Sequence, residues 1–167
     1  LLDEFSNLVI TRTMSKSYSL AGLRVGYALA SPDLVSILDQ AREVYNVDRL
    51  AQAAALASLR DRSYFEQTRD SILKERKKFA SHLDDWGWKT CPSGANFLFT
   101  RPVDSKGVTG REVATDLYDY LTSKNVLIRY FPQHELTSSY LRISIGNAGD
   151  MNILLETIIE WKTQEQL

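Results

Sequence analysis

Cysteine and histidine, the residues from which disulfides and most zinc sites are built, are nearly absent from this sequence. It contains one cysteine, Cys91, and two histidines, His82 and His134. A single thiol cannot form an internal disulfide, and the three residues lack the spacing of a zinc site. We therefore predict neither a disulfide-stabilised secreted fold nor a metal centre.

Long apolar runs and an excess of charge of one sign are also lacking. No stretch approaches the length that crosses a membrane, and no basic segment followed by an apolar one precedes the first predicted strand. The 20 Lys and Arg residues face 21 Asp and Glu residues, and the formal net charge is -1. The one dense charge cluster, residues 74–78, lies in a helical pattern and is typical of a solvated helix face. These absences predict a cytoplasmic protein that binds neither nucleic acid nor membranes.

What is present is the composition of an ordinary globular protein, with 44% hydrophobic and 25% charged residues in a chain of 167. Runs of β-branched and apolar residues predict strands over 7–12, 25–30, 88–91, 96–101, 126–130 and 140–145. Apolar residues at helical spacing predict helices over 31–44, 48–59, 61–86 and 110–123, and a last one from 150 onward. We expect Ser31 and Asp150 to cap the first and last helices, and Gly87 to end the long one.

The order of these elements predicts an α/β fold with two parts. Residues 1–60 contain only two strands and are too few to enclose a core, so they are typical of the edge of a larger α/β domain. Residues 61–167 predict a small α+β domain, in which helices cover a mostly antiparallel sheet.

The segment from Thr13 to Arg24 is the most informative for function. It places Lys16 between hydroxyl residues directly after a buried strand, with Arg24 eight positions on. The hydroxyls of Thr13 and Ser15 and the guanidinium of Arg24 could cradle a phosphate group, and a lysine beside them could reach an aldehyde on the same ligand. From composition alone, a solvent-exposed lysine in a polar loop is favoured. A P-loop is excluded, because no Gly-x-x-x-x-Gly-Lys pattern is present.

The run Ser15-Lys16, followed by 20–24 and by Gly26-Tyr27, resembles the cofactor-lysine motif of fold-type I aminotransferases of classes I and II. The match is ungapped. The resemblance implies that residues 1–60 end the large domain that binds pyridoxal 5'-phosphate (PLP), and that Lys16 is the catalytic lysine that holds the cofactor. It also assigns the cofactor's phosphate to Thr13, Ser15 and Arg24.

Four further stretches are similar to the histidinol-phosphate aminotransferases within that family. They are residues 45–54, 92–97, 126–131 and 140–146, so the resemblance covers nearly the whole chain. It implies transamination of L-histidinol phosphate with 2-oxoglutarate, yielding glutamate, in the histidine-biosynthesis pathway by a homodimer.

Two arginines in the last predicted strands are the candidate substrate-binding residues. Arg142 alternates with Leu141 and Ile143, and an arginine on one face of a half-buried strand needs an anionic partner. On the residues alone, an internal ion pair and a ligand site are equally favoured. The resemblance implies that Arg142 binds the substrate's α-carboxylate and that Arg129 helps bind the phosphate of histidinol phosphate.

Three alternatives stay open at this point. The protein could be another class I or II aminotransferase for aromatic or acidic amino acids, a threonine-phosphate decarboxylase, or a folded fragment without catalysis. The resemblance implies an enzyme of about twice this length, and the chain does not begin with Met. We therefore expect a piece that binds the cofactor weakly, turns over nothing measurable, and exposes an apolar face in its first sixty residues that favours a non-native dimer or aggregation.

Overall fold

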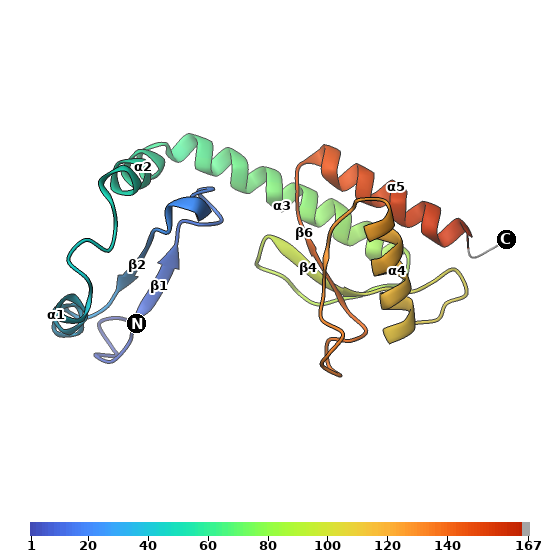
Figure 1. The fold of residues 1–167 in the computed structure, drawn as a ribbon, viewed down its shortest axis with the longest axis horizontal. Helices are drawn as coiled ribbons and strands as arrows, with labels where there is room; N and C mark the ends of the chain where they lie inside the picture. The colour runs from blue at the N-terminus through green and yellow to red at the C-terminus, as the bar shows by residue number, and fades with distance from the viewer. Residues whose placement is uncertain (165–167) are drawn as a thin grey trace. The chain divides into compact units, whose positions relative to one another are not determined.

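A computed structural model describes residues 1–164 of the chain, and in it the chain forms two compact units (Figure 1). Unit 1 is Leu1–Arg69, and unit 2 begins at Asp70. The boundary lies inside helix α3 (Arg62–Asp85) rather than before it, where the sequence pattern places it. Because α3 contains neither Gly nor Pro, nothing in the helix marks the point at which one unit ends.

Unit 1 contains one small sheet and the helices that follow it. Its elements are β1 (Ile10–Thr13), the short 3-10 helix η1 (Ala21–Leu23), β2 (Gly26–Leu29), α1 (Pro32–Ala41), α2 (Arg49–Arg60) and the first part of α3. Strands β1 and β2 pair antiparallel, with Thr13 opposite Gly26 at the end where the connecting loop begins.

The starts of the two short helices follow their capping residues. The carboxylate of Asp48 accepts hydrogen bonds from the backbone N–H groups of Leu50 (2.8 Å) and Ala51 (3.0 Å), and so caps α2. Ser31 occupies the N-cap position of α1, as predicted. Its hydroxyl, however, donates to the backbone carbonyl of Ser6 (3.1 Å) instead of accepting from the first turn.

Unit 1 buries very little apolar surface. Only Met14, Ala51 and Ala55 are buried hydrophobic residues within it. Its exposed large apolar side chains are Leu1, Phe5, Val9, Leu23, Tyr27, Leu29, Val35, Ile37, Leu38, Val44, Tyr45, Leu50, Leu56, Leu59 and Tyr64. A monomeric domain seldom exposes so much apolar surface, so this unit has the surface of a structure that packs against something else.

Unit 2 is built on a four-stranded sheet of order β3-β4-β6-β5, in which every neighbouring pair is antiparallel. The strands are β3 (Lys89–Thr90), β4 (Phe97–Arg101), β5 (Arg129–Tyr130) and β6 (Leu141–Ser144). The helices are the remainder of α3, α4 (Arg111–Ser123) and α5 (Ala148–Gln164). The predicted α/β class, ending in helices over a mostly antiparallel sheet, is confirmed.

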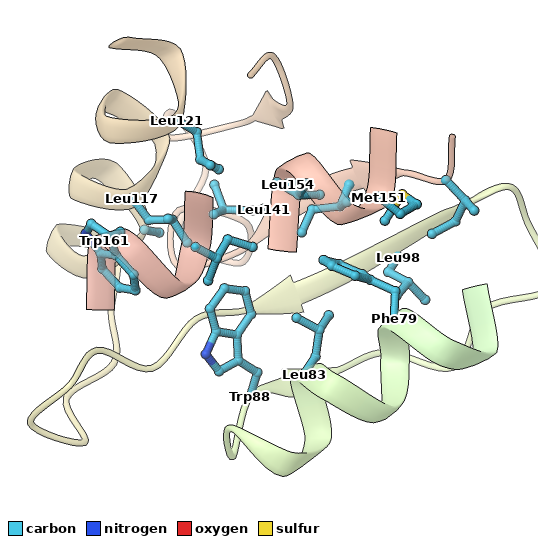
Figure 2. Close-up of a cluster of buried hydrophobic side chains, with 14 of the residues drawn as sticks. Phe79, Leu83, Trp88, Leu98, Leu117, Leu121, Leu141, Met151, Leu154 and Trp161 are labelled. Carbon is cyan, nitrogen blue, oxygen red and sulfur yellow. The ribbon is translucent and has the colours of Figure 1, made fainter. Parts of the chain in front are cut away.

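All three helices of unit 2 contribute to one hydrophobic core, together with alternate residues of β4 and β6 (Figure 2). Its buried members are Phe79, Leu83, Trp88, Leu98, Val113, Ala114, Leu117, Leu121, Leu141, Ile143, Ile145, Met151, Leu154, Ile158 and Trp161. Since side chains alternate across a strand, the residues between these in β4 and β6 point to the opposite face of the sheet. That face, which we call the outer face, carries the candidate substrate residues.

The long helix α3 ends as the sequence predicts. Gly87 has a left-handed φ of 73°, and the backbone N–H of Trp88 donates to the carbonyl of Leu83 (2.9 Å), closing the helix in a Schellman motif. Only glycine adopts this φ without a steric cost.

The predicted cap of the last helix is wrong. Helix α5 begins at Ala148, so Asp150 lies in its first turn, and Asn147 precedes the helix. The side chain of Asn147 accepts from the backbone of Asp150 (3.0 Å), and the carboxylate of Asp150 accepts from the backbone of Asn147 (3.2 Å). The two residues thus form a reciprocal capping box. A sequence search for a single acidic N-cap does not tell which of the two residues precedes the helix.

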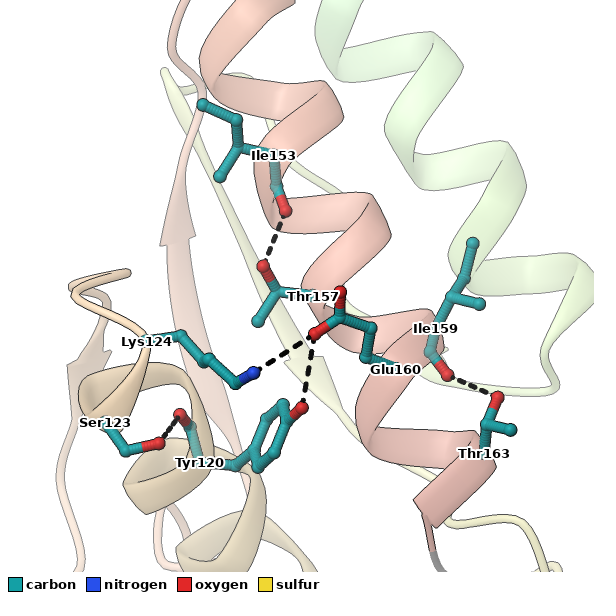
Figure 3. Close-up of polar contacts among 8 residues, drawn as sticks. All are labelled: Tyr120, Ser123, Lys124, Ile153, Thr157, Ile159, Glu160 and Thr163. Atoms are coloured by element: carbon teal, nitrogen blue, oxygen red, sulfur yellow. Dashed lines mark hydrogen bonds and ion pairs between the residues drawn. The ribbon is translucent and has the colours of Figure 1, made fainter.

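Polar contacts join the end of α4 to α5 (Figure 3). The carboxylate of Glu160 accepts from the Tyr120 hydroxyl (3.3 Å) and the Lys124 ammonium (3.4 Å). The hydrogen bond to Glu160 raises the pKa of Lys124 above its ordinary value. The indole of Trp161, which is buried, donates to Asp116 (2.6 Å), and so ties the same two helices together beside the core.

Candidate active site

The loop that carries Lys16 is anchored by Met14, the first residue after β1. Its side chain is 2% exposed. Its backbone N–H donates to the carbonyl of Val25 (3.1 Å), and its own carbonyl accepts from Leu20 (3.1 Å). The buried side chain and the two hydrogen bonds fix both ends of the loop, so the lysine leaves the hairpin from a defined point.

Lys16 begins a tight turn that closes at Ser19. The Ser19 N–H donates to the Lys16 carbonyl (3.0 Å), and Ser19 itself has a φ of 57°. A left-handed conformation is uncommon for a residue other than glycine, and it is sustained here by the fixed ends of the loop. The side chain of Lys16 is exposed.

Gly26 explains why the motif requires glycine two residues after Arg24. A Cβ at Gly26 would lie 2.7 Å from the backbone oxygen of Arg12, closer than real Cβ contacts. Strand β1 therefore approaches β2 too closely for any side chain at this position. The glycine keeps Thr13, its partner in the ladder, at the base of the lysine loop.

The hydroxyl and guanidinium groups predicted as a phosphate cradle lie at the same end of the hairpin. The Thr13 hydroxyl accepts from the backbone N–H of Ser15 (3.1 Å). Arg24 has a left-handed φ of 54°, and one of its terminal nitrogens donates to the Ala21 carbonyl (2.9 Å). Its exposed guanidinium keeps further N–H donors for an oxyanion. The donor set therefore fits a phosphate ester held beside the lysine.

The two candidate substrate arginines form a direct cross-strand pair on unit 2. In the β5–β6 ladder Arg129 lies opposite Arg142, and Phe99 of β4 lies on the other side of Arg142. Like charges directly opposite each other destabilise a sheet. The Nε atom of Arg142 is also buried without a hydrogen-bond partner, which is costly for a charged donor. Both features would be relieved by an anion.

Aromatic rings around Arg142 were missed by the sequence reasoning. Its guanidinium lies 5.4 Å from the ring centroid of Phe97 and 5.9 Å from that of Phe131. Such rings favour a cation and fix the direction of the side chain. Phe97 and Phe99 occupy alternate positions of one strand, and this period of two was the available signal.

The structure thus groups the predicted residues into two sets. Thr13, Ser15, Lys16 and Arg24 share the hairpin end of unit 1, and the arginine pair lies on the outer face of unit 2. Residues 1–164 contain no cluster of three or more His, Cys, Asp or Glu side chains suited to a metal ion. Among the same residues, no helix is both long and apolar enough to cross a membrane.

Two features point to one class of protein: a lysine on a hairpin loop with hydroxyl and guanidinium groups at the same end of the hairpin, and a second unit whose sheet carries an arginine pair. The chain belongs to the aminotransferase class I and II family, whose model matches residues 1–158.

Individual relatives show which members of the family this chain is similar to. The chain is 41% identical over 161 residues to a histidinol-phosphate aminotransferase from Synechocystis sp., which covers 96% of this chain and 44% of that protein. The crystal structure of histidinol-phosphate aminotransferase from Sinorhizobium meliloti in complex with pyridoxal-5'-phosphate is similar with a TM-score of 0.81 and 27% identity, over 95% of this chain and 42% of that one. L-threonine-O-3-phosphate decarboxylase from Porphyromonas gingivalis is similar with a TM-score of 0.72 and 26% identity, over 95% and 49%. The chain therefore spans less than half the length of each of these proteins.

Proposed function

We propose that this chain is the carboxy-terminal part of a PLP-dependent enzyme that transaminates L-histidinol phosphate with 2-oxoglutarate in histidine biosynthesis. The family membership supports an aminotransferase, and the names of relatives such as the Synechocystis protein support this substrate. The observation that carries the proposal is the hairpin end of unit 1, where a lysine loop is fixed beside hydroxyl and guanidinium donors.

Lys16 is the proposed catalytic residue. PLP, when bound, supplies an electron sink that weakens the bonds at the amino carbon of a substrate. The amine of Lys16 would bind the cofactor at its aldehyde carbon and later carry a proton to and from the substrate's carbon. The anchored loop favours this role, because an amine on a mobile loop would lose the positioning that proton transfer requires.

The cofactor's phosphate is assigned to Thr13, Ser15 and Arg24. A guanidinium presents a planar fork to phosphate oxygens, and two hydroxyls can donate to the remaining ones. The guanidinium of Arg24 donates to the Ala21 carbonyl (2.9 Å), which holds it at this end of the hairpin and supports the assignment.

The substrates are assigned to Arg142 and Arg129. Glutamate carries carboxylates, whereas histidinol phosphate carries a phosphate. In a ping-pong cycle both substrates bind in turn to the same pocket. Two arginines directly opposite each other suit both, since each can meet a carboxylate or a phosphate oxygen. The rings of Phe97 and Phe131 would keep the Arg142 guanidinium in place between the two half-reactions.

The whole enzyme is proposed to be a cytoplasmic homodimer. Because this chain spans less than half of its relatives, we expect it to bind PLP weakly by itself and to turn over no substrate. The apolar side chains exposed on unit 1 support a larger assembly around it.

A second candidate is the decarboxylation of a phosphorylated amino acid, favoured by the likeness to the threonine-phosphate decarboxylase. Its substrate would carry both a phosphate and a carboxylate, and the arginine pair suits that combination as well.

The cofactor assignment is tested by incubating the purified chain with PLP, reducing it with borohydride, and mapping the labelled peptide by mass spectrometry. We expect label on Lys16, and none at that peptide in Lys16→Ala. Lys78→Ala, which removes an exposed lysine of α3, is the matched control and should leave the label in place. Label spread evenly over surface lysines in the unmodified chain would contradict the assignment.

The substrate class is tested by ligand-induced stabilisation of unit 2. L-Histidinol phosphate should raise its unfolding midpoint more than L-phenylalanine or L-aspartate, and O-phospho-L-threonine represents the decarboxylase alternative. The increment should fall in Arg142→Gln. Stronger stabilisation by aspartate or phenylalanine would favour another amino acid as substrate.

A further inference from the structure

We propose that Lys89 and Arg101 form a second anion site on the outer face of unit 2, and that it binds a phosphate group. Nothing in the proposed transamination assigns a role to either residue. The proposal depends on neither the lysine loop nor PLP.

The register of the β3–β4 ladder places the two side chains together. Lys89 lies directly opposite Arg101, and the next pair is Thr90 and Thr100. The hydroxyls of those threonines are 2.8 Å apart, and Thr100 is fully buried on the core side. Because side chains alternate, the Lys89–Arg101 pair lies on the outer face, away from the helices.

This pair has no counter-charge within the part of the chain that the structure describes. Among residues 1–164, no acidic side chain makes an ion pair or hydrogen bond with Lys89 or Arg101. The Nε atom of Arg101 is buried and has no hydrogen-bond partner. A like-charge pair directly across a ladder is destabilising, and a buried donor without an acceptor adds to that cost. An anion bound between the two side chains would remove both penalties.

The Lys89–Arg101 pair is offset along the sheet from the arginine pair assigned to the substrates. Arg142 lies opposite Phe99, so Arg101 is displaced from it by two residues along β4. That diagonal spacing is about 7–8 Å between strands. The ring of Tyr140 stacks on Phe99 with centroids 4.9 Å apart, next to the diagonal. Lys89 lies one strand further out.

The chemistry of the pair favours phosphate over a single carboxylate. Arg101 offers a planar fork of N–H donors, and Lys89 adds a compact positive charge that can turn toward the same ligand. Two facing cations match a doubly charged oxyanion, which a phosphate group becomes near neutral pH. The group could belong to free inorganic phosphate or to a phosphomonoester such as histidinol phosphate.

The test uses the full chain in which both substrate arginines are replaced, Arg129→Gln and Arg142→Gln. The urea midpoint of unit 2, followed by tryptophan fluorescence, is measured against inorganic phosphate and against L-histidinol phosphate at constant ionic strength. We expect saturable stabilisation by both ligands. Adding Arg101→Gln should weaken the apparent affinity at least about tenfold, since a hydrogen bond to a charged group is lost. A lower dissociation constant for histidinol phosphate would identify the phosphomonoester as the occupant, and equal constants would identify free phosphate.

A charge reversal provides the second, independent variant. Lys89→Glu places a carboxylate opposite Arg101, so it should raise the midpoint in phosphate-free buffer and abolish the response to phosphate. Lys78→Glu, the matched reversal on α3, should leave the response unchanged. The proposal is overturned if phosphate fails to stabilise the arginine-replaced chain, or if Arg101→Gln and Lys89→Glu respond to phosphate as their parent does. Loss of Lys16 labelling would refute the cofactor assignment without affecting either result.

Discussion

Replacing Leu117 by alanine tests the core on which the candidate substrate face depends. Leu117 lies on α4 and is 0% exposed, among core residues from all three helices and the sheet. A fully buried Leu→Ala change removes the transfer free energy of the lost carbons and leaves a cavity, and costs about 2–5 kcal/mol. A domain of this size is stabilised by about 5–15 kcal/mol in total. The substitution should therefore remove a large share of the stability of unit 2.

The chain offers a natural reporter for this measurement. Its three tryptophans, Trp86, Trp88 and Trp161, all lie in unit 2, so tryptophan fluorescence follows that unit alone. Urea slopes for small domains are about 1–3 kcal/mol per molar, so a loss near 3 kcal/mol moves the midpoint by about 1–3 M. The measurement is a urea titration of both proteins at one temperature.

Leu127→Ala is the matched control, because it makes the same chemical change in the same unit. Leu127 is 81% exposed, so its replacement should alter stability by no more than about 0.5 kcal/mol. If Leu117→Ala costs less than about 1 kcal/mol, or no more than the control, then α4 does not pack on this sheet as described. That result would also refute the assignment of an outer face opposite the core.

The remaining expectations concern local geometry. Gly26→Ala should lower the PLP labelling of the chain several-fold, because the new Cβ would lie 2.7 Å from a backbone oxygen of β1. Gly22→Ala is the control, since a Cβ there has nothing within 4 Å. Equal labelling of the two variants would refute this expectation. Asn147→Ala should lower the urea stability of unit 2 by about 1 kcal/mol through loss of the α5 cap, and an unchanged midpoint would contradict the capping box. The raised pKa of Lys124 means that its contact with Glu160 contributes stability below the ordinary lysine pKa and loses it as pH rises through the raised value. Urea midpoints of Glu160→Gln and the unmodified chain should therefore converge only in strongly alkaline solution.

The lysine loop could be singled out as a candidate cofactor site from the sequence because its residues are contiguous. A lysine after an apolar and β-branched run, hydroxyls at fixed offsets and a glycine after Arg24 all lie between residues 7 and 26. The structure shows that the strand is largely exposed, and it adds the reason for that glycine. The helices were predictable for the same reason, since propensity, spacing and caps act within a few residues. The α5 cap was misassigned because Asn147 and Asp150 fit the same pattern three residues apart.

The strands were found, but their partners were not. The face of Arg142 followed from alternation, yet nothing local indicates that Arg129 lies opposite it. The boundary between the two compact units lies inside α3, and a continuous helix carries no local mark where its packing partners change.

The sequence by itself therefore determined the family, the candidate cofactor lysine and the order of the elements, since each rests on residues that are neighbours in the chain. Tertiary structure alone decided which charges meet across the sheet. The Arg129–Arg142 and Lys89–Arg101 pairs each join segments about a dozen residues apart, through ladder registers that are set by burial of the opposite face. A shift of two residues in either register would keep the same faces buried but would separate these cations, so the alternation within one strand does not specify which residues meet.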